Sequence, residues 1–409
     1  MTPNAIIIGS GHYVTGKTEL DNKKKTDKDM GVLLPGIAYL KKINKINEIF
    51  LVSVNGNSLN KKIKAWRSQT KEIFKGIKIE TYPNKGQFDK NAYKKILRNI
   101  KKPCVAFIAT PDHTHKKIIK DCIENEVPFF VVKPAVTNLK DFYQLNDSLE
   151  NSSISGMVDY HKVFDESNIL TRDAINSKKL GDLYHISSVM TQRKTMLEIY
   201  KRWLSKKGAP NINHYLGSHY IHLTSFLTQA TPLEVRATSQ KLGKDFKNFS
   251  NIPSMIQTQI KWKKNKDFFH SYHLSGWADP ENTESMTTQE LTVFGSKGKL
   301  CSDQKFRGTY SVTDEEGYEV ENPYFFNLRQ DLNDQINLKN KYGFISIENF
   351  VDACKDCGFK KFKKNFRGPS FQESENVTAI LEAADLSIKN SNKIVKIFLE
   401  NKKYKLRIL

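Results

Sequence analysis

A lysine and a histidine stand where side chains could bind and transfer protons. Lys133 closes an apolar strand pattern over Phe129–Val132. An ammonium group at a strand end needs a polar partner, and it can hydrogen-bond or protonate a reacting oxygen. His219 follows Gly217 at the start of a helical pattern over Ser218–Thr228, where the positive end of a helix would favour a neutral imidazole, ready to accept a proton. The alternative for Lys133 is a structural lysine that extends its amine into water.

A glycine-rich loop follows the first apolar strand pattern. Gly9 and Gly11 have the spacing of the first two glycines in a dinucleotide-binding turn. The first permits the tight turn and the second lets backbone N–H groups approach a pyrophosphate. We therefore expect Gly9, Gly11, His12 and Tyr13 to contact a dinucleotide.

A second phosphate-binding motif overlaps this loop. Gly11–Thr18 matches the phosphate-binding loop of nucleoside triphosphatases letter for letter. That loop needs a helix beginning at Lys17 with an apolar face against the sheet. The segment Lys17–Asp29 offers Leu20 as its one apolar side chain, so the sequence favours the dinucleotide interpretation.

The end of the second strand pattern bears on which dinucleotide binds. Ile49–Val54 ends without the acidic residue that binds the adenosine ribose of NAD. Asn55 stands there instead, and Lys61 and Lys62 follow. We predict NAD or NADP as cofactor, with a preference for NADP. In the alternative, Asn55 or Ser53 binds the ribose and the lysines are merely solvated.

The first 150 residues alternate strand and helix patterns, as in a doubly wound parallel sheet. Short and nearly continuous apolar runs are typical of strands buried on both faces. These runs are Ala5–Ile8, Ile49–Val54, Ile77–Glu80, Cys104–Ala109 and Phe129–Val132. The predicted helices between them are Val32–Ile43, Asn91–Ile100 and His113–Asn125.

Beyond residue 150 the strand patterns lengthen and alternate, which indicates a sheet with one exposed face, mostly antiparallel. The predicted strands are Leu183–Gln192, Leu233–Gln240, Met255–Lys263, Phe268–Ser275 and Glu290–Phe294. The predicted helices are Glu166–Ser177, Ser218–Thr228, Ile345–Cys354 and Phe371–Asn390. We therefore predict an α/β protein with a Rossmann domain over 1–150 and an α+β domain over 151–409 that binds substrate and forms oligomers.

The order and spacing of the motifs resemble the Gfo/Idh/MocA oxidoreductases, a family named for glucose–fructose oxidoreductase and inositol dehydrogenase. The matching segments are Gly9–Gly11, Thr110–His115, Lys133–Pro134, Val158–Asp165 and Leu216–His222. The resemblance implies hydride transfer between a nicotinamide ring and a carbinol or ketone, usually on a sugar or cyclitol. It implies that Lys133 binds the reacting oxygen and that His219 is the general acid or base. The cofactor contacts it implies include Thr110, Pro111, His115, Lys133 and Pro134.

Three positions depart from the family pattern. Val132 and Tyr215 replace a glutamate and an aspartate, and His222 replaces a second aspartate. Tyr215 could still donate or relay a proton, so we keep it as a catalytic candidate. Because some family members bind the cofactor as regulators or sensors, a non-catalytic dinucleotide-binding protein is the alternative function.

Substrate contacts are expected from polar residues of the second domain together with Lys133 and His219. The candidates are Tyr160, His161, Lys162, Asn213, His214 and Trp277. Trp262, Trp277, Phe268 and Phe269 lie in strand patterns and are predicted to be core or interface residues. An exposed sheet face would suit pairing into a homodimer or homotetramer.

The composition of the chain limits the kinds of substrate, partner and compartment to be expected. The net charge of +21 would attract an anionic substrate such as a nucleotide-sugar, although the lysines are spread along the whole chain. No tract mixes basic and aromatic residues, so nucleic acid is not an expected partner. No run of about 18 apolar residues exists, so no membrane span is expected. Five scattered cysteines and no signal-peptide pattern predict a reducing cytoplasm and no metal site.

Overall fold

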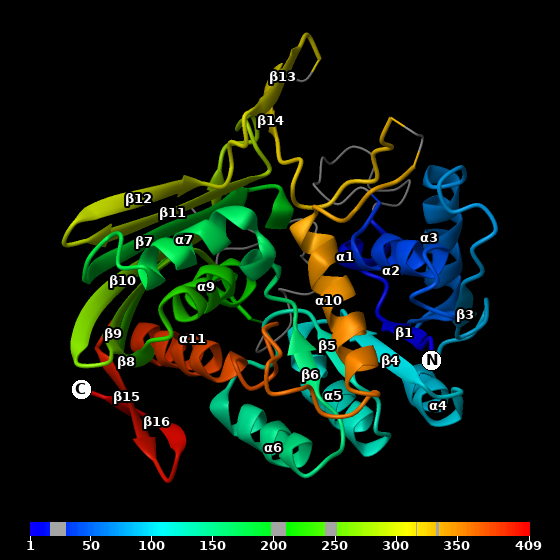
Figure 1. Cartoon of the computed structure of the whole chain (residues 1–409), viewed down its shortest axis with the longest axis horizontal. Coiled ribbons are helices and arrows are strands. Elements are labelled where there is room, and N and C mark those ends of the chain that lie inside the picture. Colours follow the sequence, from blue (N-terminus) through cyan, green and yellow to red (C-terminus); the bar gives the residue numbers. More distant parts are fainter. Residues whose placement is uncertain (17–29, 198–209, 242–251, 316, 333–334) are drawn as a thin grey trace. The chain divides into compact units, whose positions relative to one another are not determined.

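The computed structural model describes residues 1–16, 30–197, 210–241, 252–315, 317–332 and 335–409 (Figure 1). Their contacts divide the chain into two compact units. Unit 1 comprises Met1–Ala135, Gln144–His161 and Tyr324–Phe371, and unit 2 comprises Val136–Tyr143, Lys162–Pro323 and Gln372–Leu409. This division differs from the single boundary predicted at residue 150, because a C-terminal segment belongs to unit 1. Among the described residues, none of the helices has the length and apolarity to cross a membrane.

Unit 1 contains a six-stranded parallel sheet in the order β3-β2-β1-β4-β5-β6. The strands are β1 (Asn4–Ile8), β2 (Ile49–Val52), β3 (Glu80–Tyr82), β4 (Cys104–Ile108), β5 (Phe129–Val131) and β6 (Gly156–Val158). Every residue of the central strands β1 and β4 is buried, which explains their continuous apolar sequences. The predicted Rossmann sheet is confirmed, although the third strand starts at Glu80 rather than Ile77 and β6 was not predicted.

The helices of unit 1 alternate with these strands. They are α1 (His12–Thr15), α2 (Leu33–Lys42), α3 (Gly56–Gln69), α4 (Ala92–Asn99), η2 (Asp112–Thr114), α5 (His115–Glu124) and α10 (Tyr342–Asp356). The sequence did not predict α3, whose buried residues are separated by many polar ones. The chain passes between the units five times, after Ala135, within α6 (Leu139–Glu150), at η3 (His161–Phe164), after Pro323 and after Phe371.

Helix α10 explains why the C-terminal segment belongs to unit 1. The ring of Phe350 lies 5.5 Å from that of Phe107 on β4 and 5.6 Å from that of Phe130 on β5. On α2, Tyr39 meets Phe344 edge-on at 5.3 Å. Periodicity predicts this helix correctly, but it cannot reveal which sheet the helix covers.

Unit 2 contains an eight-stranded sheet in the order β12-β11-β7-β10-β9-β8-β15-β16. The strands are β7 (Leu183–Arg193), β8 (Thr231–Lys241), β9 (Pro253–Lys264), β10 (Asp267–Asp279), β11 (Thr287–Gly295), β12 (Gly298–Asp303), β15 (Val395–Glu400) and β16 (Lys403–Ile408). Neighbours pair antiparallel except β7 and β10, which run parallel. The predicted, mostly antiparallel sheet is therefore confirmed.

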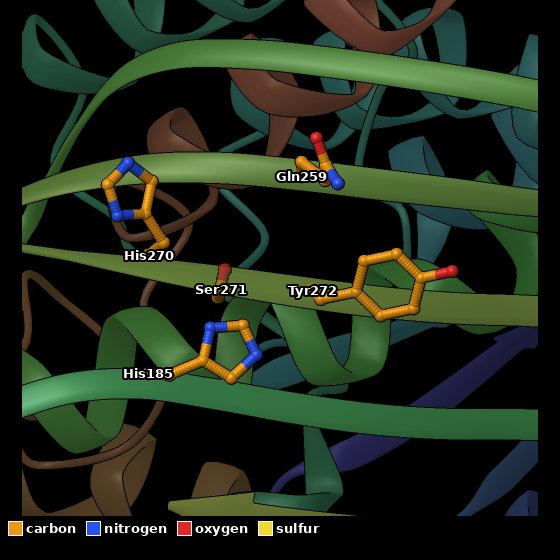
Figure 2. A pocket seen from close by; sticks show the side chains of 5 residues that line it. All are labelled: His185, Gln259, His270, Ser271 and Tyr272. Carbon is orange, nitrogen blue, oxygen red and sulfur yellow. The ribbon is translucent and has the colours of Figure 1, made fainter. Parts of the chain in front are cut away.

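Helices, buried aromatic residues and one pocket are associated with the eight-stranded sheet. The helices are α7 (Glu166–Asn176), α9 (Ser218–Thr228) and α11 (Ser374–Lys389), and α9 and α11 contact β7, β8 and β15 (Figure 1). Trp262, Phe269 and Trp277 are at most 2% exposed, which confirms them as core residues, whereas Phe268 is 53% exposed. A pocket of about 440 Å³ is lined by His185, Gln259, His270, Ser271 and Tyr272 on strands β7, β9 and β10 (Figure 2). None of the predicted site residues lines it.

Candidate active-site residues in the two units

The glycine loop adopts a conformation that only glycine supports at its first position. Gly9 has φ +117°, and a Cβ atom there would lie 2.0 Å from the carbonyl oxygen of Ala109. At Gly11 a Cβ would meet no atom within 4 Å, so the loop backbone is open to an approaching group. The helix that follows is the short α1, and the predicted absence of a helix after Lys17 concerns residues outside the described ones. This cradle fits a pyrophosphate.

Polar contacts hold the loop against the neighbouring strand ends. Ser10 Oγ donates to Ser53 Oγ at 3.1 Å, and the ammonium of Lys62 on α3 donates to the carbonyl of Ser10. Asn55, the candidate ribose ligand, is the N-cap of α3, where its Oδ1 accepts from the Ser58 N–H at 3.0 Å. Its side-chain oxygen is therefore already used by the helix.

Tyr13 is fixed by a buried carboxylate. Its hydroxyl donates to Asp159 Oδ2, and Ser346 Oγ on α10 donates to Asp159 Oδ1 at 2.8 Å. Nδ1 of His161 lies 3.5 Å from the same Oδ1, and its ring packs against Tyr342 at 5.7 Å. Asp159 thus connects the glycine loop to the end of β6 and to α10. The neighbouring Tyr160 is 1% exposed.

His115 joins two turns at the C-terminal ends of β4 and β5. Its Nε2 lies 2.8 Å from the Thr110 carbonyl and its Nδ1 lies 3.0 Å from the Pro134 carbonyl. The side chain is 0% exposed, and burial lowers its pKa. His115 therefore positions the Thr110–Pro111 turn against the Lys133–Pro134 turn, whose peptide bond is cis.

Lys133 faces a buried acid. Asp112 follows Pro111 and is 7% exposed, and its Oδ2 has no hydrogen-bond partner in the described part of the chain. Burial raises the pKa of the Asp112 carboxyl to about 7, and the positive charge of Lys133 opposes that rise. The sequence thus placed Lys133 at the sheet edge correctly and overlooked Asp112 beside it.

Unit 2 holds a separate group of buried polar atoms around Gly217. A Cβ on Gly217 would lie 2.0 Å from Asn213 Oδ1 and 3.0 Å from Ser275 Oγ, so glycine makes room for both side chains. Within the described residues, neither amide atom of Asn213 has a hydrogen-bond partner, and neither has Ser275 Oγ or the indole N–H of Trp277. Gln192, in register with Trp277, adds an unpaired Oε1. Buried polar groups are rarely left unpaired, so this cluster suits a ligand with hydroxyl groups.

Family models match both units. An oxidoreductase-family model with an NAD-binding Rossmann fold matches residues 4–160, and the GFO/IDH/MocA C-terminal domain matches residues 170–301. The chain belongs to the Gfo/Idh/MocA oxidoreductase family. Its members are NAD(P)-dependent oxidoreductases.

Solved structures share the fold at low sequence identity. Myo-inositol 2-dehydrogenase from Lactobacillus plantarum matches with a TM-score of 0.70 and 14% identity, over 97% of this chain and 100% of that one. Scyllo-inositol dehydrogenase from Lactobacillus casei, with bound NAD(H) and scyllo-inositol, matches with a TM-score of 0.68 and 14% identity, over 97% and 99%. An oxidoreductase from Agrobacterium radiobacter, in complex with NAD+, L-tartaric acid and magnesium, matches with a TM-score of 0.68 and 14% identity, over 97% of this chain and 98% of that one. A search of curated proteins found no match. Since these ligands differ, the family fold does not define the substrate.

One expectation about the family histidine needs correction. His219 does not open a helix, because the π-helix η4 (Asn213–Gly217) runs directly into α9. The N–H groups at the start of α9 are already bonded within this continuous run, so no free helix end acts on the imidazole. His219 is 6% exposed.

The residues near His219 have defined contacts. The ring of Tyr215 stacks on that of Trp277 at 6.2 Å. His214 Nδ1 lies 3.1 Å from Asn211 Oδ1, and burial lowers its pKa. His222, in place of a family aspartate, has Nε2 3.9 Å from Glu373 Oε2, and burial lowers its pKa as well.

Lys162 was predicted to bind substrate, but its contacts are structural. It is 2% exposed, and its ammonium donates to Gln289 Oε1 at 2.6 Å and to Gln304 Oε1 at 2.9 Å. The ammonium also lies 4.7 Å from the centre of the Tyr220 ring. These partners use its N–H groups, so we assign Lys162 to the core of unit 2.

Sequence reasoning missed four polar residues of these sites. Asp112, Asp159, Gln192 and Ser275 are each buried, and none was singled out as a candidate, although Asp112 and Asp159 lie within segments that resemble the family. An acid within four residues of a strand end is a usable signal for the first two. Ser275 and Gln192 lie on the inward face of alternating strands, where a polar residue is unusual. No group of three or more metal-ligating side chains occurs in the described ranges.

Proposed function

We propose that this protein is an NAD(P)-dependent dehydrogenase or reductase acting on a CH–OH or keto carbon of a polyhydroxylated substrate. The observation that carries the proposal is the position of Lys133 just after β5, at the C-terminal edge of the Rossmann sheet, where its positive charge acts on the buried Asp112. Open α/β sheets bind ligands at that edge. The glycine loop of unit 1 lies after β1, at the same edge, because all six strands are parallel.

The residues of unit 1 fit a nicotinamide dinucleotide. Gly9 and Gly11 would admit the pyrophosphate, and Lys62 at the loop carbonyl brings a positive charge to it. No acid follows β2, so the proposal keeps a preference for NADP over NAD. Tighter binding of NADH than of NADPH in a fluorescence titration would reverse that preference.

Each candidate residue has a defined task. When bound, the nicotinamide ring donates or accepts the hydride. Lys133 would donate a hydrogen bond to the reacting oxygen, and Asp112 would hold the ammonium in position. His219 would take the hydroxyl proton during oxidation and return it during reduction, and the hydroxyl of Tyr215 could relay it.

The polar cluster of unit 2 indicates the chemical class of the substrate. Asn213, Ser275, Trp277 and Gln192 present neutral donors and acceptors, which suit hydroxyl groups rather than a phosphate or carboxylate. We therefore propose a sugar or cyclitol ring as the part that reacts. A nucleotide-sugar belongs to this class as well. Its sugar would be the part that reacts, and its negatively charged phosphates would be attracted by the net positive charge of the protein.

The test is a substrate panel followed by a single substitution. Sugars, cyclitols and nucleotide-sugars are incubated with NAD+, NADP+ or their reduced forms while nicotinamide absorbance is recorded. Lys133→Ala should lower kcat by about 10²-fold or more and leave the dinucleotide Kd within about threefold. Lys62→Ala, the matched control in the same unit, should weaken dinucleotide binding instead.

The alternative function is a dinucleotide-binding regulator or sensor. The replacement of two family aspartates by Tyr215 and His222 favours it. If no panel member is converted, or if Lys133→Ala changes neither the rate of conversion nor dinucleotide binding, the catalytic proposal fails and the regulator remains.

A further inference from the structure

A two-stranded arm in unit 2 has one apolar face. Strands β13 (Thr309–Thr313) and β14 (Gly317–Glu321) pair antiparallel, and Figure 1 draws them as a ribbon separate from the eight-stranded sheet. The register pairs Tyr310 with Val320 and Val312 with Tyr318, which places these four side chains on one side. We call this set the arm face.

The arm face is exposed. Tyr310 is 55% exposed, Val312 is 67% exposed and Tyr318 is 45% exposed. The rings of Tyr310 and Tyr318 contact each other at 5.1 Å, so the aromatic surface is continuous across both strands. Contiguous exposed apolar side chains on a folded protein mark an interaction site.

The base of the arm is anchored to the rest of unit 2. The Val320 N–H donates to the Glu284 carbonyl at 2.8 Å, and Glu319 Oε1 lies 3.7 Å from the Arg193 guanidinium. A two-stranded ribbon has marginal stability by itself, so these contacts fix its base. The arm face is therefore presented in a defined orientation within unit 2.

The arm is acidic in a basic protein. The stretch 314–321 contains five acidic residues and no basic one, more than any other eight-residue stretch of the chain. The whole chain carries +21, so the residues outside this stretch carry +26, which is +21 minus −5. Two copies of so basic a chain repel one another unless opposite charges meet at their interface.

From the apolar face and the opposite charges together, we propose that the arm docks on a second copy of this chain. The arm face supplies apolar contact, and the carboxylates at the tip of the arm, Asp314 and Glu315, meet lysines of the second copy. The proposal does not depend on the proposed enzymatic function, because the arm contains none of the candidate catalytic residues.

The experiment measures self-association by sedimentation velocity from about 1 to about 50 µM, a range that brackets typical homodimer affinities. Tyr310→Ser/Tyr318→Ser removes the aromatic surface, and Asp314→Lys/Glu315→Lys reverses two charges at the tip. Ser311→Ala, on the opposite side of β13, is the matched control. Thermal unfolding and dinucleotide titration establish that each variant is folded, and Val312→Thr replaces the double tyrosine variant if that one does not fold.

The proposal predicts a wild-type dimer whose Kd rises at least about tenfold in the tyrosine variant and is unchanged in Ser311→Ala. Salt should weaken the wild-type dimer and should affect the charge-reversed variant less. A wild-type monomer throughout the range overturns the proposal, even if the arm captures a different protein. Equal association of the wild type and both arm variants also overturns it, because another surface then forms the dimer.

Discussion

The hydroxyl of Tyr13 donates a hydrogen bond to the carboxylate of Asp159, and the two residues lie 146 positions apart in the chain. The bond fixes the short helix of the glycine loop to the end of β6. Asp159 also accepts from Ser346, so its position is determined from two sides. The conformation of the loop therefore depends on a residue far outside the loop motif.

Removing this bond should weaken dinucleotide binding. Tyr13→Phe is expected to raise the Kd of the dinucleotide by about tenfold or more, because one charge-assisted hydrogen bond contributes about 1.5 kcal/mol or more. Tyr93→Phe is the control, since Tyr93 donates to Asp121 at 2.5 Å in the same unit but away from the loop. Fluorescence titration of both variants makes the comparison, and an equal change in the two would count against the role of Tyr13.

The buried Asp112 should make the free energy of unfolding depend on pH. Burial raises the pKa of Asp112 to about 7 from 3.8, so the folded carboxyl retains a proton that the unfolded chain releases near pH 4. The free energy of unfolding should therefore decrease as pH rises from about 4 to 7, by at most about 4 kcal/mol. Asp112→Asn removes this contribution and should be more stable than the wild type at pH 8. Urea unfolding at pH 5 and pH 8 measures it, and parallel pH profiles would contradict the assignment.

If the amide of Asn213 is left without a hydrogen-bond partner so that it can bind a ligand, it should lower the free energy of unfolding of the ligand-free protein. Asn213→Leu is expected to leave stability unchanged or to raise it by about 1 kcal/mol, while KM for the substrate rises at least about tenfold. Asn168→Leu is the matched control, because the Asn168 amide donates to the Lys162 carbonyl at 2.8 Å and accepts from Gln304 at 2.7 Å. That variant should lose about 2 kcal/mol. Similar losses in both variants would show that Asn213 is only structural.

The buried Lys162 should give the opposite pH dependence to Asp112. Burial lowers its pKa to about 7 from 10.5, with Asp165 opposing and Arg307 reinforcing the change. Between pH 7 and 10 the unfolded chain binds the proton that the folded protein has released, so the free energy of unfolding rises with pH, by about 1.4 kcal/mol per unit. Lys162→Met removes this slope. Chemical denaturation at pH 7, 8 and 9 tests it, and an unchanged slope in the variant would exclude Lys162 as the titrating group.

Strongly periodic elements could be predicted from the sequence. The helix expected over Ser218–Thr228 has those bounds in the structure, and the strand expected at Cys104–Ala109 ends one residue earlier. β6 is three residues long and follows no long apolar run, unlike β5, so no strand pattern marks it. α3 was missed although its buried Leu59, Ile63 and Trp66 recur at the i, i+4, i+7 spacing of an amphipathic helix, so the signal was present in the sequence.

At the candidate sites, the sequence predicted which residues follow the ends of strands. It could not predict contacts between residues that are far apart in the chain. Lys133 and the Thr110–Pro111 turn follow adjacent strands, so strand order alone places them at one edge. The contacts of Lys162 could not be predicted, because its partners Gln289 and Gln304 come 127 and 142 residues later. Local sequence also could not show that η4 continues into the helix of His219.

Helix α10 has a consequence for how the chain folds as it is synthesised. N-terminal domains commonly fold while the ribosome is still translating the rest. Here Phe107 on β4 and Phe130 on β5 are covered by Phe350, so this part of the Rossmann sheet stays uncovered until that residue has left the ribosome. Unit 1 is therefore completed only after most of unit 2 has been translated, and the apolar strands around these two rings must be shielded until then.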